Sequence, residues 1–495
     1  MDNKKHVLII GGGLSGLLNA CILLKNGFKV SLLEKHFQIG GCLQTFTRKG
    51  KRFDTGMHYF GSINKGEVLY KIFKYVDIID KINLFKIDYD IINYKNRSYK
   101  LMCDRDAFIN KLAKDFPNDI DSINKYVDKI YEVSSSSSMF NLKIPKEDSY
   151  LKEEFIETSV YNYLSTFVKN NDLKNVLCGL LPLYAGEKEI TPFYLNAYLH
   201  RSYLDGSYRI IGGSVTLANA LVNEIKSMGG QVILNANVNH IHIKDKLAIG
   251  VDYNSNQYLS ADYIISTIHP KRLFEITDSS AFRKIYKTRL KNIPDTISSF
   301  TIYLSFKSNR VDYMPYNYYH YYGDEIWGGE NYTKENWPRN FLYMHMSDYK
   351  EQRYANSGVV ICYMNFEDVK EWSGTSIGRR GKSYEEYKKE KAEKVINLID
   401  KEFAGFKDSI EDYYTSSPLT YRDYTGSENG SLYGMHRDCR RNLETTITPQ
   451  TKIKNLYLSG QNISMHGMLG VSIGALITCS NLVEIDDVLD QINKE

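Results

Sequence analysis

Short apolar runs that end at a glycine or at one polar residue recur along the chain, and each predicts a buried β-strand. The first run covers residues 7–10, an apolar helix is predicted over 17–24, and a second strand follows over 29–34. The same patterns return later as the strands 231–238, 247–253, 261–267 and 454–460 and as the helices 217–225 and 471–483. Strands that alternate with helices in this way predict an α/β fold.

Two long stretches, 66–204 and 291–409, interrupt this alternation. We expect the first to be largely helical and the second to hold a strand and then a helix. The clearest segments are the helices 106–115, 118–133 and 384–402 and the strand 298–306. The serine run 134–138 is expected to end a helix or to form a loop. Because 495 residues are many for one domain, these stretches predict a second domain.

The first strand leads directly into Gly11-x-Gly13-x-x-Gly16, and this turn opens the first helix. Gly11 permits a tight turn, Gly13 lets the backbone approach a pyrophosphate, and Gly16 lets the helix pack closely on the strand. The helix start presents free N–H groups and a positive dipole end to a phosphate. Glu34 ends the second strand, where its carboxylate can accept hydrogen bonds from ribose hydroxyls. This order of elements predicts a dinucleotide-binding site.

Composition excludes several classes of protein. The net charge is +4 and the charged residues are interspersed, which gives no indication of nucleic-acid binding. The seven cysteines form no CxxC pair, so neither a disulfide framework nor a metal site is expected. The run at 7–10 is too short for a signal peptide, which predicts a cytoplasmic location. Residues 467–483 are too short, too polar and too rich in glycine for a membrane span.

A second group of motifs follows Glu34. The chain reads Gly40-Gly41-Cys42, then Thr45-Phe46, and then Phe53-Asp54-Thr55-Gly56-Met57-His58-Tyr59. This order resembles the carotenoid and retinoid oxidoreductases, the superfamily of phytoene desaturases and retinol saturases, and it is most similar to the retinol saturase branch. The resemblance implies FAD as the cofactor. It also implies a Rossmann-type FAD-binding domain of the two-dinucleotide-binding, amine-oxidase-like kind, with an inserted α+β substrate domain.

The resemblance extends to the chain segments near residues 206–238 and 454–483, and it divides the chain. The FAD-binding domain is expected to be discontinuous, over 1–65, 205–290 and 410–495. The substrate or lid domain is expected to comprise 66–204 and 291–409. A helix start near residue 467 is implied to face the isoalloxazine, because reduced flavin carries negative charge.

The resemblance assigns residues to the cofactor along all three FAD segments. Gln461-Asn462 follow Gly460 at a point where many relatives have an acid. The residues implied to bind FAD are Gly11, Gly13, Leu14, Ser15, Gly16, Glu34, Lys35, Gly40, Gly41, Thr45, Gly56, His58, Val238, Gly460, Gln461, Met468 and Leu469.

The catalytic candidates are His58, Tyr59 and His466, because each is expected near the flavin, where it could position a substrate or donate a proton. A structural role is equally compatible with the sequence of each. His240 and His242 alternate along a predicted strand, so they share one face, which is expected to face solvent.

Aromatic residues are dense between Tyr313 and Tyr343, which leaves two interpretations open. They line a pocket for an extended apolar ligand, or they pack in an ordinary core of a chain that contains 40 tyrosines.

The resemblance implies an FAD-dependent oxidoreductase that acts on C=C bonds of an apolar polyene or isoprenoid-like molecule, with reduction as the favoured direction. The alternatives are a phytoene-type desaturase, a carotenoid cis/trans isomerase, a flavin amine oxidase, and a prenyl-lipid carrier without activity. No second GxGxxG with its acid is present, so the electrons come from transiently bound NAD(P)H or from a separate reductase. Peripheral contact with a membrane and the oligomeric state stay open.

Overall fold

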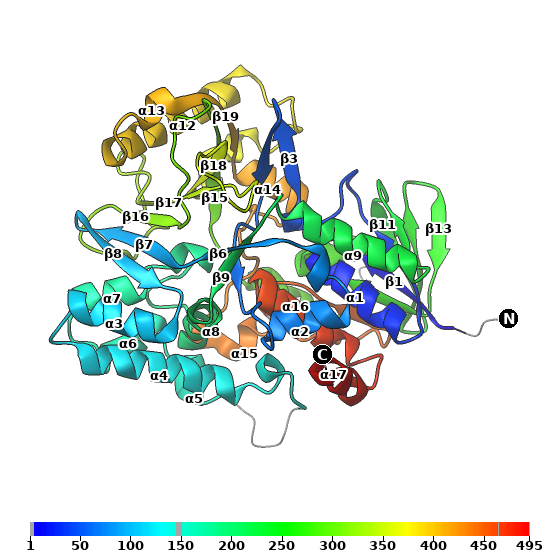
Figure 1. The fold of residues 1–495 in the computed structure, drawn as a ribbon. Helices are drawn as coiled ribbons and strands as arrows, with labels where there is room; N and C mark the ends of the chain where they lie inside the picture. Colours follow the sequence, from blue (N-terminus) through cyan, green and yellow to red (C-terminus); the bar gives the residue numbers. More distant parts are fainter. Residues whose placement is uncertain (1–3, 145–150, 279, 464, 495) are drawn as a thin grey trace.

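The computed structural model describes residues 4–144, 151–278, 280–463 and 465–494. Within these residues, two large sheets organise the chain, and we call them the parallel sheet and the mixed sheet. Figure 1 shows the parallel sheet with β1 and its helices on the right, and the mixed sheet with β15 and β18 above and to the left. The chain crosses between the two sheets several times, so neither is formed by one continuous segment.

The parallel sheet has the strand order β10-β2-β1-β14-β20, and every neighbouring pair is parallel. Its strands are β1 (His6–Ile10), β2 (Lys29–Leu33), β10 (Gln231–Ile233), β14 (Tyr263–Ser266) and β20 (Leu456–Leu458). Three regions far apart in the sequence therefore meet edge to edge. The predicted strands are present; β1 is one residue longer than expected, and the other four are shorter by one or more residues.

Both faces of the parallel sheet are covered because its strands are apolar on both sides. Val7 and Ile9 pack on the helices α1 (Leu14–Lys25), α9 (Val215–Ser227) and α16 (Gly467–Cys479). Leu8 and Ile10 face the opposite layer. This layer contains β11 (Val238–Lys244), β12 (Leu247–Tyr253), β13 (Gln257–Ser260), α10 (Pro270–Leu273) and α11 (Lys284–Asn292), while α2 (Val68–Tyr75) and α17 (Ile485–Lys494) extend the helical layer.

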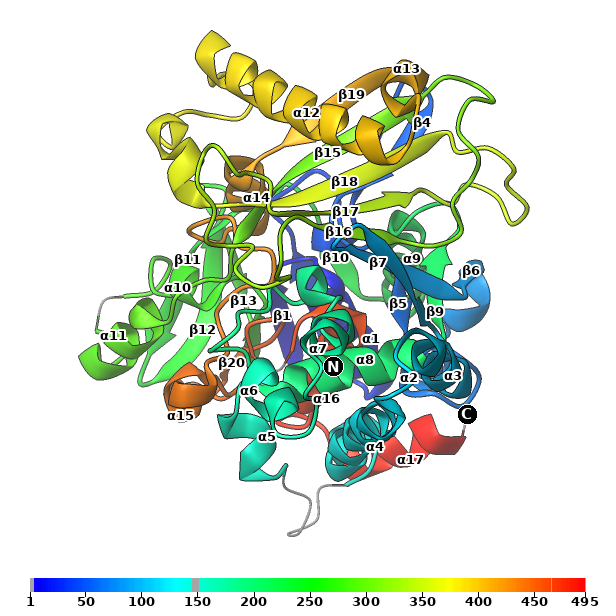
Figure 2. The same ribbon diagram turned by 90° about the vertical axis from the view of Figure 1, so that its left-hand side faces the viewer.

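The mixed sheet has the order β19-β15-β18-β17-β16-β7-β8, and only the pair β16–β7 is parallel among the described strands. Its strands are β7 (Tyr89–Tyr94), β8 (Arg97–Met102), β15 (Ser298–Phe306), β16 (Tyr318–Tyr321), β17 (Asn340–His345), β18 (Ser357–Met364) and β19 (Ile410–Ser416). Figure 2 shows α12 (Lys382–Glu402) lying across this sheet. Ile302 and Leu304 pack under α12, whereas Tyr303 faces the other side, so the whole of β15 is buried.

A group of helices packs on the second face of the mixed sheet, in cyan and green at the lower left of Figure 1. These helices are α3 (Arg105–Asp115), α4 (Ile120–Ser136), α5 (Glu153–Glu157), α6 (Val160–Ser165), α7 (Asn171–Leu177) and α8 (Phe193–Leu204). The smaller elements are β3 (Thr45–Arg48), β4 (Lys51–Asp54), β5 (Phe60–Gly61), β6 (Leu84–Ile87), β9 (Ser207–Ile210), α13 (Phe406–Ser409), α14 (Pro418–Thr425) and α15 (Asn442–Thr445).

Two predicted elements differ from the structure. The helix expected over 471–483 begins earlier and ends earlier, as α16, because Gly467 and Gly470 form its first turn instead of a loop. The stretch 66–204 was expected to be largely helical, yet it also contributes the hairpin β7–β8 to the mixed sheet. Lys95 and Asn96 form the turn of this hairpin with positive φ angles of 50° and 57°, a conformation that suits a two-residue hairpin loop.

The predicted helices 106–115, 118–133 and 384–402 correspond to α3, α4 and α12, and the predicted strand 298–306 is β15, but 291–409 also contributes β16, β17 and β18 to the mixed sheet. The serine run ends a helix, since α4 continues to Ser136. Among the described residues, no helix combines the length and the apolar character that a bilayer span requires. The predicted limits of the two domains stay a prediction.

Candidate active site

A cavity of about 420 Å³ is lined from both sheets, which is within the usual size of a ligand pocket. The parallel sheet contributes the carboxyl ends of β1, β2 and β14, the place where ligands bind in open α/β sheets. The opposite wall comes from α8 and from β17 and β18. The first turns of α1 and α16 and the helix α14 complete the lining.

The glycine turn after β1 has the geometry that its sequence predicts. Gly11 has a φ of +104°, in a backbone region that residues other than glycine rarely adopt. A Cβ on Gly16 would lie 2.1 Å from the carbonyl oxygen of Gly11, so only glycine allows α1 to pack this closely. A Cβ on Gly13 would meet no atom within 4 Å, which leaves the backbone open to the cavity.

Glu34 follows β2 and is held in place by the backbone. Its Oε2 accepts a hydrogen bond of 2.7 Å from Gly12 N–H, and its Oε1 accepts one of 2.9 Å from His36 N–H. The side chain is nearly buried and lines the cavity. Each carboxylate oxygen has a further lone pair, so Glu34 can still accept hydrogen bonds from a ligand.

Two helices begin at the cavity without a side-chain cap. The N-cap residue of α1 is Gly13 and that of α16 is His466, and neither donates or accepts a capping side-chain hydrogen bond in the described structure. Neither helix has an acidic residue in its first turn. Both starts therefore present backbone N–H donors and a positive dipole end to the cavity. Such starts fit a pyrophosphate and an anionic reduced flavin, the two negative parts of FAD.

Charge is confined to one wall of the cavity. Among the described residues of the lining, the charged side chains are Glu34, Lys35 and Arg272, and all three come from the layers around the parallel sheet. The wall from α8 and the mixed sheet is uncharged, and apart from Ser202 its residues are apolar or aromatic. They are Leu195, Tyr198, Leu199, Tyr203, Leu342, Met344 and Ile361, with Phe140 stacked on Tyr198 at 3.8 Å between ring centroids.

The catalytic candidates His58, Tyr59 and His466 all line this cavity. Burial lowers the pKa of both His58 and His466 to about 4. Burial also raises the pKa of Tyr59 well above its usual value. All three side chains are therefore uncharged at neutral pH. The Nδ1 atom of His58 has no hydrogen-bond partner in the described part of the chain, so it is available to a ligand.

The structure gathers nearly all of the residues that the sequence assigned to FAD. Every one of them lines the cavity except Gly16 and Thr45. Gly16 lies behind the turn, where it sets the distance between helix and strand. Thr45 begins β3, pairs with Asp54 and accepts a hydrogen bond of 2.9 Å from Gln38 at its carbonyl oxygen, outside the lining.

The sequence interpretation missed most of the aromatic lining. The aromatic residues between Tyr313 and Tyr343 do not line this cavity, and Tyr319, Trp337 and Phe341 lie in the core around the mixed sheet. The lining rings come instead from Tyr198 and Tyr203 on α8, from Tyr421 and Tyr424 on α14, and from Phe60, Phe140 and Tyr433. For α8, the available signal was the i, i+3, i+4 spacing of Leu195, Tyr198 and Leu199, which places them on one helix face.

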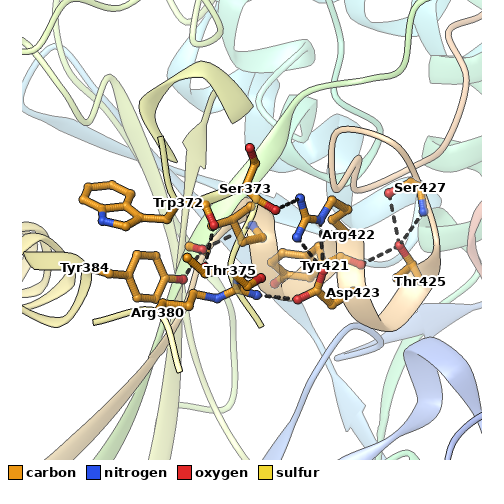
Figure 3. Close-up of polar contacts among 12 residues, drawn as sticks. Trp372, Ser373, Thr375, Arg380, Tyr384, Tyr421, Arg422, Asp423, Thr425 and Ser427 are labelled. Carbon is orange, nitrogen blue, oxygen red and sulfur yellow. Dashed lines mark hydrogen bonds and ion pairs between the residues drawn. The ribbon is translucent and has the colours of Figure 1, made fainter. Parts of the chain in front are cut away.

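A polar cluster fixes α14 against the cavity (Figure 3). Asp423 on α14 forms ion pairs with Arg380, which precedes α12, and with Arg422. Arg380 also donates a hydrogen bond of 2.9 Å to the carbonyl oxygen of Thr375. On the other side, Lys35 Nζ donates a hydrogen bond of 3.0 Å to the carbonyl oxygen of Asp423. The helix is thus tied both to the end of β2 and to the layer over the mixed sheet.

His36 adds a further link between α14 and the residues after β2. Its ring stacks on Tyr424 with the centroids 4.9 Å apart, and its Nε2 lies 3.1 Å from the carbonyl oxygen of Tyr424. Both Glu34 and α14 line the cavity. The links across His36 and Lys35 therefore join two parts of the cavity wall into one unit.

Proteins that are similar to this chain in sequence agree with this arrangement. The family model of the flavin containing amine oxidoreductases matches residues 14–477. An all-trans-retinol 13,14-reductase of Rattus norvegicus is 27% identical, over 98% of this chain and 86% of the rat protein. A chloroplastic prolycopene isomerase of an Oncidium hybrid cultivar is 25% identical, over 97% of this chain and 84% of its own length.

A crystal structure of an oxidoreductase from Methanosarcina mazei has the same fold. Its TM-score is 0.64 at 14% identity, and the match covers 95% of this chain and 99% of the other. The predicted fold class, a Rossmann-type FAD-binding fold with an inserted α+β part, is confirmed. The predicted resemblance to carotenoid and retinoid oxidoreductases is confirmed as well.

Proposed function

Because the chain belongs to the flavin containing amine oxidoreductases and is an FAD-dependent oxidoreductase, we propose that it reduces one C=C bond of an apolar polyene or isoprenoid-like molecule. The rat relative is named for the reduction of all-trans-retinol and the Oncidium relative for the isomerisation of prolycopene. The observation that carries the proposal is the uncharged wall of α8 and the mixed sheet, which shares one cavity with the start of α16.

In this proposal FAD extends along the charged side of the cavity. The ribose binds Glu34, the adenine lies near the backbone of Val238, and the pyrophosphate lies at the start of α1. The isoalloxazine lies at the start of α16, near Met468 and Leu469, with His58 beside it. The starts of α1 and α16 support this direction, because each directs a positive helix-dipole end toward a negative part of the cofactor.

The substrate then occupies the apolar side. Leu195, Leu199 and Met344 present hydrocarbon surface, and the stacked pair Phe140–Tyr198 presents flat aromatic surface. An extended polyene gains free energy when it leaves water for such a wall, at about 25 cal/mol for each Å² of buried apolar surface. The wall offers little to a charged substrate.

The same wall argues against the amine oxidase alternative. An ammonium group buried in a pocket needs a carboxylate or another compensating partner. Glu34 is the one carboxylate in the described lining, and it lies at the end of β2 with Gly12 and His36 as partners. We therefore favour an uncharged substrate.

FAD supplies the hydride of the reduction when it is bound and reduced. The residues of this chain hold the double bond beside it, exclude water and deliver the proton that completes the saturated product. His58, Tyr59 and His466 are the candidates for that proton or for positioning the substrate, since all three line the cavity. Desaturation uses the same arrangement but starts from oxidised flavin, whereas cis/trans isomerisation starts from reduced flavin and leaves it reduced.

We also propose NAD(P)H as a transient electron donor, with a separate reductase as the competing source. Anaerobic mixing of the oxidised protein with NADPH or NADH separates the two, since only direct transfer bleaches the flavin absorbance. For the location of the protein, a cytoplasmic position with peripheral contact to a membrane is proposed, because an apolar substrate partitions into bilayers.

One anaerobic experiment tests the proposed reaction. The FAD-loaded protein is reduced with dithionite, excess dithionite is removed, and a retinoid or another short polyene is added. We expect the flavin to reoxidise while the polyene gains two hydrogen atoms by mass. Geometric isomers at unchanged mass with reduced flavin indicate an isomerase. Bleaching of oxidised protein by a more saturated substrate indicates a desaturase, and both results contradict the reductase.

A further inference from the structure

Arg209 on β9 is a buried cation whose hydrogen bonds all go to neutral groups. Its guanidinium donates to the hydroxyl of Tyr313 at 2.8 Å and to the carbonyl oxygens of Met314 and Tyr316 at 3.1 and 2.8 Å. It also donates to Oδ1 of Asn317 at 2.9 Å. The side chain is nearly fully buried, so its positive charge is poorly screened by water.

Asn317 connects this cation to a buried acid. Its side-chain Nδ2 donates a hydrogen bond of 2.8 Å to Oδ1 of Asp90 on β7. Asn317 therefore accepts from Arg209 and donates to Asp90, and it forms an amide bridge between opposite charges. Asp90 is 1% exposed and does not line the cavity.

The second carboxylate oxygen of Asp90 is linked to the active site by a hydrogen bond from Tyr59. The hydroxyl of Tyr59 donates to Oδ2 of Asp90 at 3.2 Å, and it also bonds the hydroxyl of Tyr319 on β16. Tyr59 lines the cavity and its ring packs at a tilt against Tyr203 of α8, with ring centroids 4.9 Å apart. Of the described hydrogen-bond partners of Asp90, Tyr59 lines the cavity and Asn317 does not.

The pKa of Asp90 is raised by burial and not by the groups around it. Burial raises its pKa to about 6, although the hydrogen bonds from Asn317 and Tyr59 and the charge of Arg209 oppose this rise. The titratable groups that face Asp90 are Tyr59, Cys103 after β8, Tyr203 on α8, Arg209 on β9 and Tyr319 on β16. Apart from Arg209, these groups are neutral at pH 6, because burial raises the pKa of each of the tyrosines and of the cysteine.

We propose that Asp90 is the proton reservoir of the reaction and acts through the hydroxyl of Tyr59. This inference rests on the proposed C=C reduction and adds the source of its proton. One substrate carbon accepts a hydride from the reduced flavin, and the other forms a C–H bond with the proton of Tyr59. As the Tyr59 O–H bond breaks, the proton of Asp90 passes to the Tyr59 oxygen.

The step leaves the tyrosine neutral and Asp90 as a carboxylate. The amide bridge to Arg209 stabilises that negative charge, so Arg209 and Asn317 are positioning residues for Asp90. Asp90 then takes up a proton from water before the next turnover. The two electrons come from the reduced flavin, and no further oxidant or reductant is needed.

A purely structural role for this cluster makes a different prediction. Buried ion pairs are weak evidence for stability, and loss of one partner chiefly destabilises the fold. A structural role therefore predicts a loss of stability in Asp90→Asn with no change in the pH dependence of proton transfer. The proposed role predicts a change in the pH dependence.

The test uses three variants of the FAD-loaded protein. Asp90→Asn keeps the size and the hydrogen-bonding geometry but removes the acidic proton, and Tyr59→Phe removes the relay. Tyr321→Phe is the matched control, because Tyr321 is another buried tyrosine on β16 and its hydroxyl bonds the carbonyl oxygen of Gly179 at 2.7 Å. FAD content and thermal midpoint are measured for each variant.

Two readouts decide the proposal. In single-turnover reoxidation of reduced protein by a polyene, the wild type is expected to slow about tenfold per pH unit above pH 6. Asp90→Asn and Tyr59→Phe are expected to be 10²–10⁴-fold slower, as is typical when a general acid is lost, and Asp90→Asn is expected to show no pH slope. Infrared difference titration is expected to show a carboxylic acid band that titrates near pH 6 and disappears in Asp90→Asn.

The outcomes separate this inference from the proposed function. If the wild type fails to reoxidise with any polyene, the proposed reductase function is wrong, and the proton reservoir is rejected with it. If the wild type turns over and Asp90→Asn keeps both its rate and its pH slope, only the proton reservoir is rejected. A titrating band that persists in Asp90→Asn likewise overturns the assignment of the proton to Asp90.

Discussion

The backbone N–H of Gly12 donates a hydrogen bond of 2.7 Å to the carboxylate of Glu34, which ties the glycine turn to the residue that follows β2. His36 N–H binds the other oxygen of the same carboxylate at 2.9 Å. Glu34 thus sets the shape of the turn before any ligand arrives. Its binding role and its structural role have to be separated by experiment.

Glu34→Ala is expected to weaken FAD binding at least tenfold, because two charge-assisted hydrogen bonds to the ribose are lost, each worth about 1.5–3 kcal/mol. Glu34→Gln keeps an acceptor oxygen and is expected to lose less, whereas Glu34→Arg is expected to lose more. Equilibrium titration with FAD by flavin fluorescence measures the affinities. Unchanged affinity in the alanine and arginine variants would show that Glu34 does not bind the ribose.

Substitutions of two glycines in the same turn are expected to have different effects. Gly16→Ala forces its Cβ against the Gly11 carbonyl oxygen, so it is expected to lower the free energy of unfolding by about 1–3 kcal/mol. Gly13→Ala meets no atom within 4 Å and has an ordinary φ of −74°, so its fold is expected to persist while FAD affinity falls. Urea unfolding and FAD titration of both variants provide the measurement. Equal stability of the two variants contradicts the close packing at Gly16.

The cofactor-free protein is expected to lose stability as the pH falls from about 6.5 to about 4. The pKa of His58 and that of His466 are lowered to about 4 in the fold. The folded state therefore disfavours protonation, and each histidine lowers the free energy of unfolding by up to about 3 kcal/mol at the acid end. His58→Gln and His466→Gln are expected to flatten this slope in denaturant titrations at several pH values. A slope that both variants retain assigns the acid sensitivity to other groups.

Arg380→Ala is expected to accelerate FAD release, because Arg380 is nearly buried and pairs with Asp423 on α14. Loss of one partner of a buried ion pair lowers the free energy of unfolding by about 3–5 kcal/mol. Here the destabilised element is α14, which lines the cavity. Lys382→Ala is the matched control, since Lys382 pairs with Glu386 on the exposed surface of α12. The FAD-loaded protein is diluted into buffer, and FAD dissociation is followed by flavin fluorescence. Equal rates in both variants would show that the cluster in Figure 3 does not hold α14 over FAD.

Leu199→Trp is expected to leave FAD content unchanged and to weaken polyene binding at least tenfold. Leu199 lies on α8 in the apolar wall, and the larger indole fills space that the substrate needs. Binding of a short and a long polyene is compared by fluorescence quenching. A longer polyene is expected to lose more affinity, and an equal affinity of wild type and variant for both would exclude α8 from the substrate wall.

The sequence predicted the glycine turn, Glu34 and α16 because these features depend on residues that are neighbours in the chain. Gly11 and Gly16 carry their conformational requirement in their own identity, and Glu34 follows a strand of clear apolar pattern. The wall from α8 and β17 could not be predicted in the same way, because it depends on how the mixed sheet folds back on the parallel sheet. Tyr198 and Leu342 meet in the cavity from distant parts of the chain.

The aromatic-rich region between Tyr313 and Tyr343 shows what composition alone does not predict. Tyr319 and Tyr343 lie on strands that are covered on both faces, by α12 on one side and by the helical group on the other. Both tyrosines are nearly fully buried in that core. A ring that fills a core and a ring that lines a pocket have the same sequence signature. Only the layering of the elements separates them.

The parallel sheet has a consequence for how the protein is made. Its edge strand β20 and the helix α16, which packs on α1, are synthesised well after β1, α1 and β14. Until they emerge, the apolar surfaces of α1 and β14 lack their native cover, and the FAD cavity lacks one of its two helix starts. Such late, long-range assembly slows folding and exposes aggregation-prone surface. The complete FAD cavity therefore forms only after α16 has been synthesised and has packed on α1.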